Sequence, residues 1–193
     1  MVKIAIGLPT RGEVHIKTVY SLLRAVNELS PNEICLIFKQ GTYIHEMRNQ
    51  TVELAIHQKC DYLMFIDSDI TFPPDGITKL IGRNKDIIGG MYNHKELPQK
   101  STIRMVDEKG EYLEQFVIPE EEIFKVYGLP TGFMLIKLDA IKDIKDPFDF
   151  GKRVDGTLIG EDINFCIRAK EEQGIDSWCD PTITIKHIGD FEF

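Results

Sequence analysis

The feature that most constrains the fold is an apolar run that ends in two acids. Residues 61–71 read DYLMFIDSDIT, so five apolar residues stand directly before Asp67-Ser68-Asp69. An uninterrupted apolar run of this length predicts a strand buried on both faces of a sheet. Because side chains alternate along a strand, we expect both carboxylates on one side and Ser68 on the other. The carboxyl end of a central strand is where open α/β sheets bind ligands.

These two acids also indicate what lies beside them. Carboxylates that are buried and unpaired are strongly disfavoured, so a divalent cation or a set of hydrogen-bond donors is expected next to Asp67 and Asp69. Oxygen ligands suit Mg²⁺ or Mn²⁺. The residues that follow, 72–76, contain Pro73-Pro74, which should stop the strand and open a helix.

The first ninety residues alternate between strand and helix patterns. We expect strands at 3–8, 33–38 and 86–91 in addition to the acidic strand, and helices at 14–29, at 43–58 and from Pro73 to Ile81. This βαβαβαβ order implies a parallel sheet with right-handed crossovers.

The pattern changes in the second half of the chain. Strands are expected at 101–106 and 111–117 around a hairpin turn at 107–110, then at 123–127, 133–137, 175–179 and 182–187, with a helix at 161–172 that ends at Gly174. A nucleotide-type front half, about 1–95, is thus joined to a mixed back half, about 96–193. No linker-like stretch separates them, so we expect a single domain over residues 1–193.

Composition narrows the class of protein. With 23 basic and 31 acidic residues the net charge is −8, which argues against a nucleic-acid or anionic-membrane surface. No apolar run approaches the ~20 residues that span a bilayer, and the first residues show no signal-peptide pattern. The four cysteines form no CxxC pair, so reduced thiols are expected. We therefore expect a cytoplasmic protein without a transmembrane segment.

Several short motifs occur along the chain in an order that is characteristic of one enzyme class. They are Pro9-Thr10-Arg11 after the first strand, Arg48-Asn49, the acidic strand end, Thr131-Gly132-Phe133-Met134, Gly160-Glu161-Asp162 and His187-Ile188-Gly189. This ordered set resembles the GT-A class of nucleotide-sugar glycosyltransferases, most closely its family-2-like members, over nearly the whole chain. The resemblance implies an α/β fold, Rossmann-like, with three α/β/α layers and a mixed central sheet.

The resemblance also assigns residues to a donor site. In such enzymes the DxD motif holds the donor diphosphate through Mn²⁺ or Mg²⁺, so Asp69 would be a direct metal ligand and Asp67 would touch the ribose or a metal-bound water. His187 matches a histidine that completes the metal site. The residues expected along the nucleotide and its phosphates are Pro9, Thr10, Arg11, Arg48, Asp67 and Ser68.

Other residues are assigned to the acceptor. Asp162 matches the acid that takes the proton from the acceptor hydroxyl in inverting enzymes, and the helix dipole should lower its pKa unless burial offsets this. Gly132 would allow close backbone approach to the acceptor, and Glu161 would face acceptor hydroxyls. Trp178 is expected in the core, with stacking on the acceptor as the alternative. The loop at 92–95 is expected to face the donor sugar.

The implied activity is that of a hexosyltransferase-type enzyme. It would move a sugar from a UDP-sugar or GDP-sugar donor to a glycan or another hydroxyl acceptor. The transfer would be a single inverting displacement. The retaining alternative stays open, and residues 38–41 lack the acids that read the base in many relatives.

Three alternatives remain at this point. A sugar nucleotidyltransferase shares the front-half architecture, although residues 9–12 are a poor match to its glycine-rich loop. A nucleotide-sugar- or glycan-binding module without turnover would use the same residues. A haloacid-dehalogenase-type phosphatase would use Asp67 as its nucleophile, but that motif normally follows the first strand, whereas two βα units precede it here.

Overall fold

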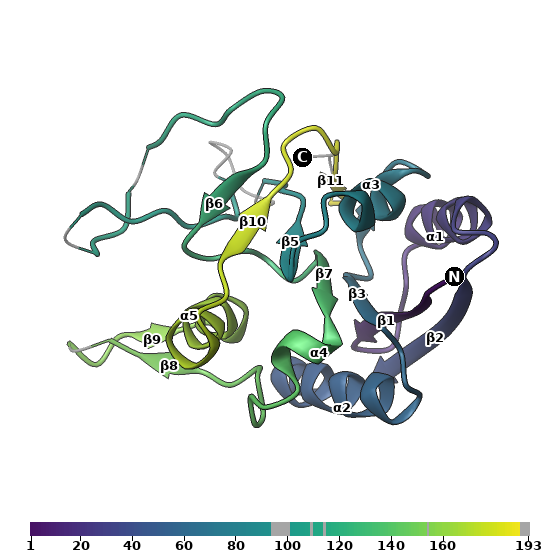
Figure 1. Ribbon diagram of the computed structural model, residues 1–193, viewed down its shortest axis with the longest axis horizontal. Helices are drawn as coiled ribbons and strands as arrows, with labels where there is room; N and C mark the ends of the chain where they lie inside the picture. Colours follow the sequence, from purple (N-terminus) through teal and green to yellow (C-terminus); the bar gives the residue numbers. More distant parts are fainter. Residues whose placement is uncertain (94–100, 109, 114, 154, 190–193) are drawn as a thin grey trace.

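The computed structural model describes residues 1–93, 101–108, 110–113, 115–153 and 155–189. Its centre is a mixed sheet of seven strands in the order β2-β1-β3-β7-β5-β10-β6 (Figure 1). These strands are β1 (Lys3–Thr10), β2 (Glu33–Gln40), β3 (Tyr62–Ile66), β5 (Ile87–Gly89), β6 (Phe124–Val126), β7 (Phe133–Lys137) and β10 (Ser177–Cys179).

Helices cover both faces of this sheet, which gives the three layers that were expected. The apolar faces of α1 (Ile16–Glu28) and α3 (Gly76–Gly82) pack on one side. On the other side lie α2 (Ile44–His57), α4 (Leu138–Ile141) and α5 (Glu161–Gln173) (Figure 1). The prediction of an α/β fold with a mixed central sheet is therefore confirmed.

The order of the strands differs in one respect from the expected parallel sheet. β1 is parallel to both β2 and β3, as expected. The next front-half strand, β5, does not pair with β3, because β7 lies between them and is antiparallel to both. A strand of the back half thus fills the middle of the sheet, and both halves share one core.

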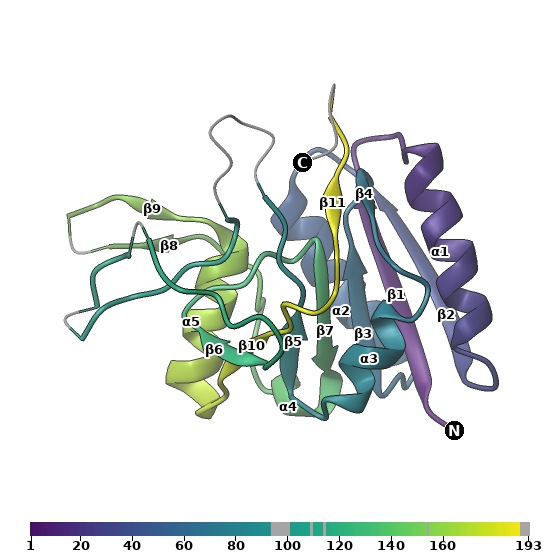
Figure 2. The ribbon, with the colours of Figure 1, turned by 90° about the horizontal axis from the view of Figure 1, so that it is seen from above.

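The acidic stretch itself is shorter as a strand than we expected. β3 ends at Ile66, and Asp67-Ser68-Asp69 form a turn, so the strict alternation of side chains does not extend to them. The chain then makes the short strand β4 (Ile70–Thr71), which pairs with β11 (Lys186–His187) in a separate two-stranded sheet. Figure 2 shows β4 and β11 side by side at one end of the large sheet. This pairing brings His187 beside the acidic turn.

The back half is less regular than its pattern predicted. In place of the two strands expected around the turn at 107–110, the structure has an isolated antiparallel bridge between Val106 and Tyr112. Lys109, in the expected turn, lies outside the described residues. A small hairpin of β8 (Gly151–Lys152) and β9 (Leu158–Ile159) was not predicted. By contrast, α5 ends as expected at Gly174, whose φ of 71° is in the left-handed region. None of the helices in the described ranges is long and apolar enough to cross a membrane.

Candidate active site

Two cavities meet at the carboxyl ends of the central strands. The first, here called the Asp69 cavity, has a volume of about 710 Å³. It is lined by every residue expected along the nucleotide, and by the three residues of the expected metal set, Asp67, Asp69 and His187. The second, the Asp162 cavity, has a volume of about 570 Å³ and contains Asp162 and Tyr92. His187 lines both, so it stands at their junction.

The acidic turn is held by backbone contacts. The backbone N–H of His15 and the hydroxyl of Thr18, both at the start of α1, donate to the carbonyl of Ser68 over 2.8 and 3.1 Å. The N–H of Asp67 donates to the carbonyl of Gly132 over 2.9 Å. These bonds tie the turn to α1 and to the segment before β7.

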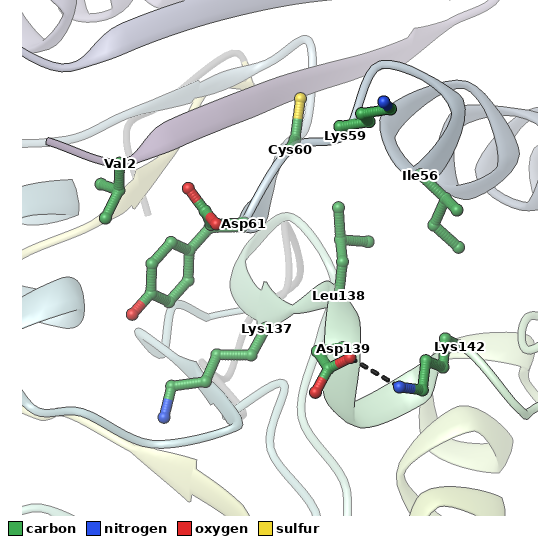
Figure 3. A pocket seen from close by; sticks show the side chains of 10 residues that line it. Val2, Ile56, Lys59, Cys60, Asp61, Lys137, Leu138, Asp139 and Lys142 are labelled. Carbon is green, nitrogen blue, oxygen red and sulfur yellow. Dashed lines mark hydrogen bonds and ion pairs between the residues drawn. The ribbon is translucent and has the colours of Figure 1, made fainter.

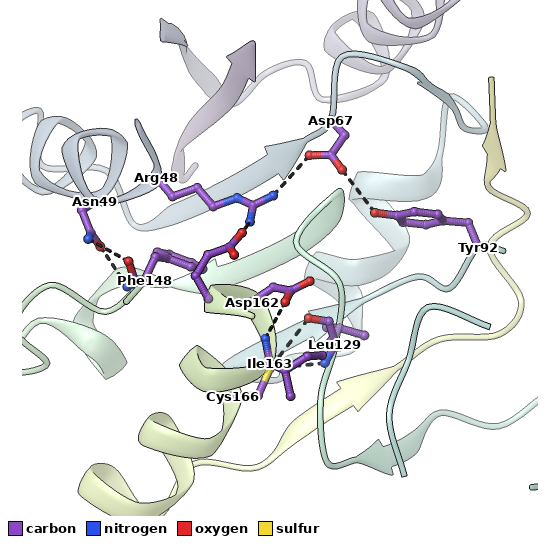
Figure 4. A network of polar contacts seen from close by, with 10 residues as sticks. Arg48, Asn49, Asp67, Tyr92, Leu129, Phe148, Asp162, Ile163 and Cys166 are labelled. Carbon is purple, nitrogen blue, oxygen red and sulfur yellow. Dashed lines mark hydrogen bonds and ion pairs between the residues drawn. The ribbon is translucent and has the colours of Figure 1, made fainter. Parts of the chain in front are cut away.

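Asp67 is engaged on both carboxylate oxygens. Arg48 on α2 approaches Oδ1 at 3.5 Å, and the Tyr92 hydroxyl donates to Oδ2 over 3.3 Å (Figure 4). Burial raises the pKa of Asp67, and the nearby Arg48 guanidinium opposes that rise. Burial also raises the pKa of Tyr92 well above its usual range, so its hydroxyl stays protonated and able to donate.

Gly132 is required by this close approach. A Cβ at this position would lie 1.9 Å from the Tyr92 hydroxyl and 2.5 Å from Oδ2 of Asp67. Gly132 therefore makes room for the Tyr92–Asp67 contact, and it lines neither cavity. Tyr92 itself was expected only as part of a loop facing the donor sugar, and the rest of that loop, His94 and Lys95, lies outside the described residues.

Asp69 and His187 form the part of the site best suited to a cation. Oδ1 of Asp69 lies 3.4 Å from Nε2 of His187. The other ring nitrogen, Nδ1, lies 3.3 Å from the carbonyl of Asn93, which is an acceptor only. If Nδ1 carries the proton to donate to that carbonyl, then Nε2 and the carboxylate are two acceptors that face each other. Such a pair needs a cation or a proton between them.

The full three-residue metal set does not assemble. Among the described residues, no group of three or more His, Cys, Asp or Glu side chains is placed to hold a metal ion. The reason is that Asp67 turns to Arg48 and Tyr92, while Asp69 turns to His187. Mg²⁺ is usually held by one or two carboxylates together with substrate phosphates, so Asp69 fits the expected cation, and Nε2 of His187 would add a nitrogen ligand beside it.

Arg48 also reaches the start of α5. Its Nη1 donates to the buried carboxylate of Glu161, so one guanidinium joins two acids from different parts of the chain. Its Nε has no hydrogen-bond partner among the described atoms. We expected Arg48 to pair with a phosphate and Glu161 to face the acceptor; the structure places the two against each other, with Glu161 outside both cavities. The neighbouring Asn49 binds the backbone of Phe148 at both its N–H and its carbonyl.

Asp162 lies in the first turn of α5 and lines the Asp162 cavity. Its Oδ1 accepts the N–H of Ile163 over 2.8 Å. Burial raises the pKa of Asp162, outweighing the lowering by Arg48 and by this hydrogen bond, while Glu161 raises it further. The expected effect of the helix dipole is thus offset by burial, and the carboxylate is a stronger base than an exposed aspartate.

One predicted acceptor residue lies elsewhere, and two arginines were missed. Trp178 lies on β10 with the ammonium group of Lys85 3.9 Å from its ring centre, and it lines neither cavity. Arg104 and Arg153 line the Asp162 cavity, although no motif marks either of them. Their only signal in the sequence is a positive charge in a chain with an excess of acids.

A third hollow of about 590 Å³ lies at the opposite, amino end of β1 and β3 (Figure 3). Two of its lysines already have partners, since Lys142 binds Asp139 at 2.7 Å and Lys137 lies 3.3 Å from Asp86. The third, Lys59, is exposed. We assign no function to this hollow.

Comparison with known proteins places the fold. No protein-family model matches the chain, and no curated protein matches its sequence. Solved structures do match. A197 from STIV aligns with a TM-score of 0.66 and 18% identity over 97% of this chain and 86% of that one.

Two further structures are similar over most of this chain. A putative glucose-1-phosphate thymidylyltransferase from Bacillus anthracis, in complex with a sucrose, gives a TM-score of 0.54 and 8% identity over 96% of this chain and 89% of that one. TarS from S. aureus, a glycosyltransferase, gives 0.50 and 13% identity over 93% of this chain and 36% of that one. At these identities the likeness concerns the fold, which is the GT-A-like fold of nucleotide-sugar transferases.

Proposed function

We propose that this protein is a metal-dependent glycosyltransferase that moves a sugar from a nucleoside-diphosphate sugar to an acceptor hydroxyl. The observation that carries the proposal is the pair of adjoining cavities, one lined by the Asp67–Asp69 turn and the other by Asp162, with His187 lining both. A donor in the first cavity and an acceptor in the second would meet at this junction. The GT-A-like fold supports the same assignment.

The donor would lie in the Asp69 cavity. Pro9, Thr10 and Arg11 follow β1 and line this cavity, where they would contact the nucleotide. Asp69 and His187 would hold Mn²⁺ or Mg²⁺, which would stabilise the charge on the departing diphosphate. Asp67 would orient the donor while Arg48 and Tyr92 keep its carboxylate in place.

Asp162 would act as the general base. Burial raises its pKa, which makes the ionised carboxylate a better proton acceptor than an exposed aspartate. It would take the proton of the acceptor hydroxyl as that oxygen bonds to the anomeric carbon. The bond from that carbon to the diphosphate oxygen breaks on the opposite side, so the configuration inverts.

Donor binding can be tested by thermal shift with UDP-, GDP-, dTDP- and CDP-sugars, each with and without Mn²⁺. A ligand that binds only the folded state raises its apparent stability. We expect a shift for one nucleotide only, dependent on Mn²⁺ and lost in Asp69→Asn. Asp139→Asn, which removes an acid at the opposite end of the sheet, is the matched control and should keep the shift. The absence of a shift for all four donors would contradict the proposal.

The transfer step needs a second measurement. With the donor identified, NMR of the product reads the anomeric configuration, and inversion is expected. Asp162→Asn should bind donor normally and transfer no sugar. A nucleotidyltransferase is the main competing activity, because one similar structure is a putative thymidylyltransferase. It would reveal itself by release of pyrophosphate from a nucleoside triphosphate and a sugar 1-phosphate.

A further inference from the structure

The Asp162 cavity is lined by two arginines as well as by its acid. Arg104, Arg153 and Asp162 all line this cavity, so its formal charge is positive although the chain carries −8. We propose that the acceptor is itself an anion, and that Arg104 and Arg153 bind a phosphate or carboxylate group on it. This inference rests on the proposed function and specifies its acceptor class.

Arg104 is held in place by backbone groups. Its Nη1 donates to the carbonyls of Ser101 and Ile103 over 3.2 and 3.1 Å. Its backbone N–H donates to the carbonyl of Gly128 over 2.9 Å, and its carbonyl accepts the N–H of Gly128 over 3.1 Å. These contacts hold one end of the guanidinium through Nη1. An arginine has five N–H donors on three nitrogens, so Nε and Nη2 would supply donors for an oxyanion.

Arg153 is held by an aromatic ring. Its guanidinium carbon lies 3.8 Å from the ring centre of Tyr112, which also lines the cavity. Its backbone closes a turn, donating to the carbonyl of Thr157 over 2.9 Å. The hydrogen bond with Tyr112 raises the pKa of the Arg153 guanidinium, and the nearby charges of Glu111 and Asp155 raise it further. Stacking of this kind orients the flat guanidinium for bidentate contacts.

Among the described residues, neither arginine has a carboxylate partner. Within the described part of the chain, no Asp or Glu oxygen lies within 4.0 Å of the charged nitrogens of Arg104 or Arg153. Three other arginines, Arg48, Arg83 and Arg168, each have such a partner. Because the chain has more acidic than basic residues, most arginines would be expected to have a carboxylate partner, yet two arginines without one line the same cavity. Planar guanidinium groups match phosphate and carboxylate oxygens in pairs, so the cavity selects an anionic acceptor over a neutral one.

The rest of the lining suits the body of a hydroxylated acceptor. The Tyr92 side chain lies beside His187, with ring centres 5.2 Å apart, and borders the same cavity as Tyr112. The hydroxyls of Thr102 and Thr157 are polar groups at the cavity wall. An acceptor anchored by its anion at the arginines would extend toward Asp162, which is the orientation that general-base catalysis requires.

The first test measures binding by NMR on the full chain with ¹⁵N-labelled arginine. The Nε–H signals of Arg104 and Arg153 are assigned with Arg104→Gln and Arg153→Gln, and the probes are glucose 6-phosphate, glucuronate and glucose. We expect at least one anion to shift both signals saturably, and glucose to leave them unchanged at the same concentration. The exposed Arg24 on α1 is the internal control and should not respond. No response from either anion, or an equal response at Arg24, would overturn the inference.

The second test separates this inference from the proposed function. Donor thermal shifts in the unaltered protein test the function, whereas the acceptor KM in the two arginine variants tests the inference. Loss of one charged hydrogen bond should raise the KM for an anionic acceptor about tenfold or more, leave a neutral acceptor unaffected and leave the donor shift unchanged. Arg24→Gln is the charge-matched control. If the arginine variants lose the donor shift instead, the arginines bind the donor and the inference is wrong.

Discussion

Replacing Arg48 with methionine tests the central electrostatic contact of the site. Its side chain is 7% exposed, and its main partner Glu161 is 11% exposed, so the substitution leaves a buried carboxylate without its cation. Removing one partner of a buried ion pair costs about 3–5 kcal/mol. Asp67, 26% exposed, loses its weaker contact at the same time. We therefore expect Arg48→Met to lower the free energy of unfolding at pH 7 by about 3–5 kcal/mol.

The loss should depend on pH in a defined direction. Arg48 lowers the pKa of Asp67 and of Asp162, both already raised by burial. Without Arg48 these folded-state pKa values rise further, and a carboxyl whose pKa is higher in the folded state disfavours folding once it ionises. The deficit of the variant is then largest at neutral pH and shrinks as the pH falls through the raised pKa values.

Urea unfolding of the unaltered protein and three variants measures this effect at neutral and mildly acidic pH. The double variant Arg48→Met/Glu161→Leu replaces both charges with apolar side chains and should recover most of the lost stability, but not transfer activity. Lys142→Met, which breaks an exposed pair with Asp139, is the control and should unfold like the unaltered protein. A deficit below about 1 kcal/mol for Arg48→Met, or one that grows in acid, would refute the reasoning.

Three further predictions follow from single positions. Gly132→Ala should lower stability by about 1–3 kcal/mol in thermal melts, because its Cβ would meet the Tyr92 hydroxyl, and adding Tyr92→Phe should restore part of that loss. The acid limb of the pH–rate profile should lie above the usual aspartate range, since Asp162 must be ionised to act and burial raises its pKa; a limb near 4 or below would contradict its role. Gly174→Ala should cost about 1 kcal/mol in urea unfolding, because φ of 71° is unfavourable for alanine, and an unchanged midpoint would contradict this.

Local patterns in the sequence predicted most elements of the fold. Periodicity located the long helices α1, α2 and α5, and Gly174 marked the end of the last of these. The position of β7 between β3 and β5 was not predicted, because sequence periodicity carries no information on which distant strands pair. The turn at 67–69 was mistaken for strand because β3 and β4 lie on either side of it and both are apolar.

The candidate site was predicted where short motifs carry it. The residues expected along the nucleotide line one cavity, as the motif order indicated. Contacts between motifs were not predicted: Arg48 binds Glu161 instead of pointing only into the cavity, and Tyr92 reaches Asp67 across the gap left by Gly132. Arg104 and Arg153 were missed because their role depends on which unpaired charges the fold brings to one wall.

The pairing of β4 with β11 has a consequence for the order in which the protein matures during synthesis. Asp69 belongs to the first half of the chain, yet its backbone carbonyl accepts the N–H of Ile188, and His187 pairs with Ile70. A nascent chain can pair β1 with β2 and β3 long before these residues leave the ribosome, because all three strands belong to the front half. The contact between Asp69 and His187 can therefore form only after residues 187 and 188 have emerged, so a partly made chain lacks this wall of the Asp69 cavity.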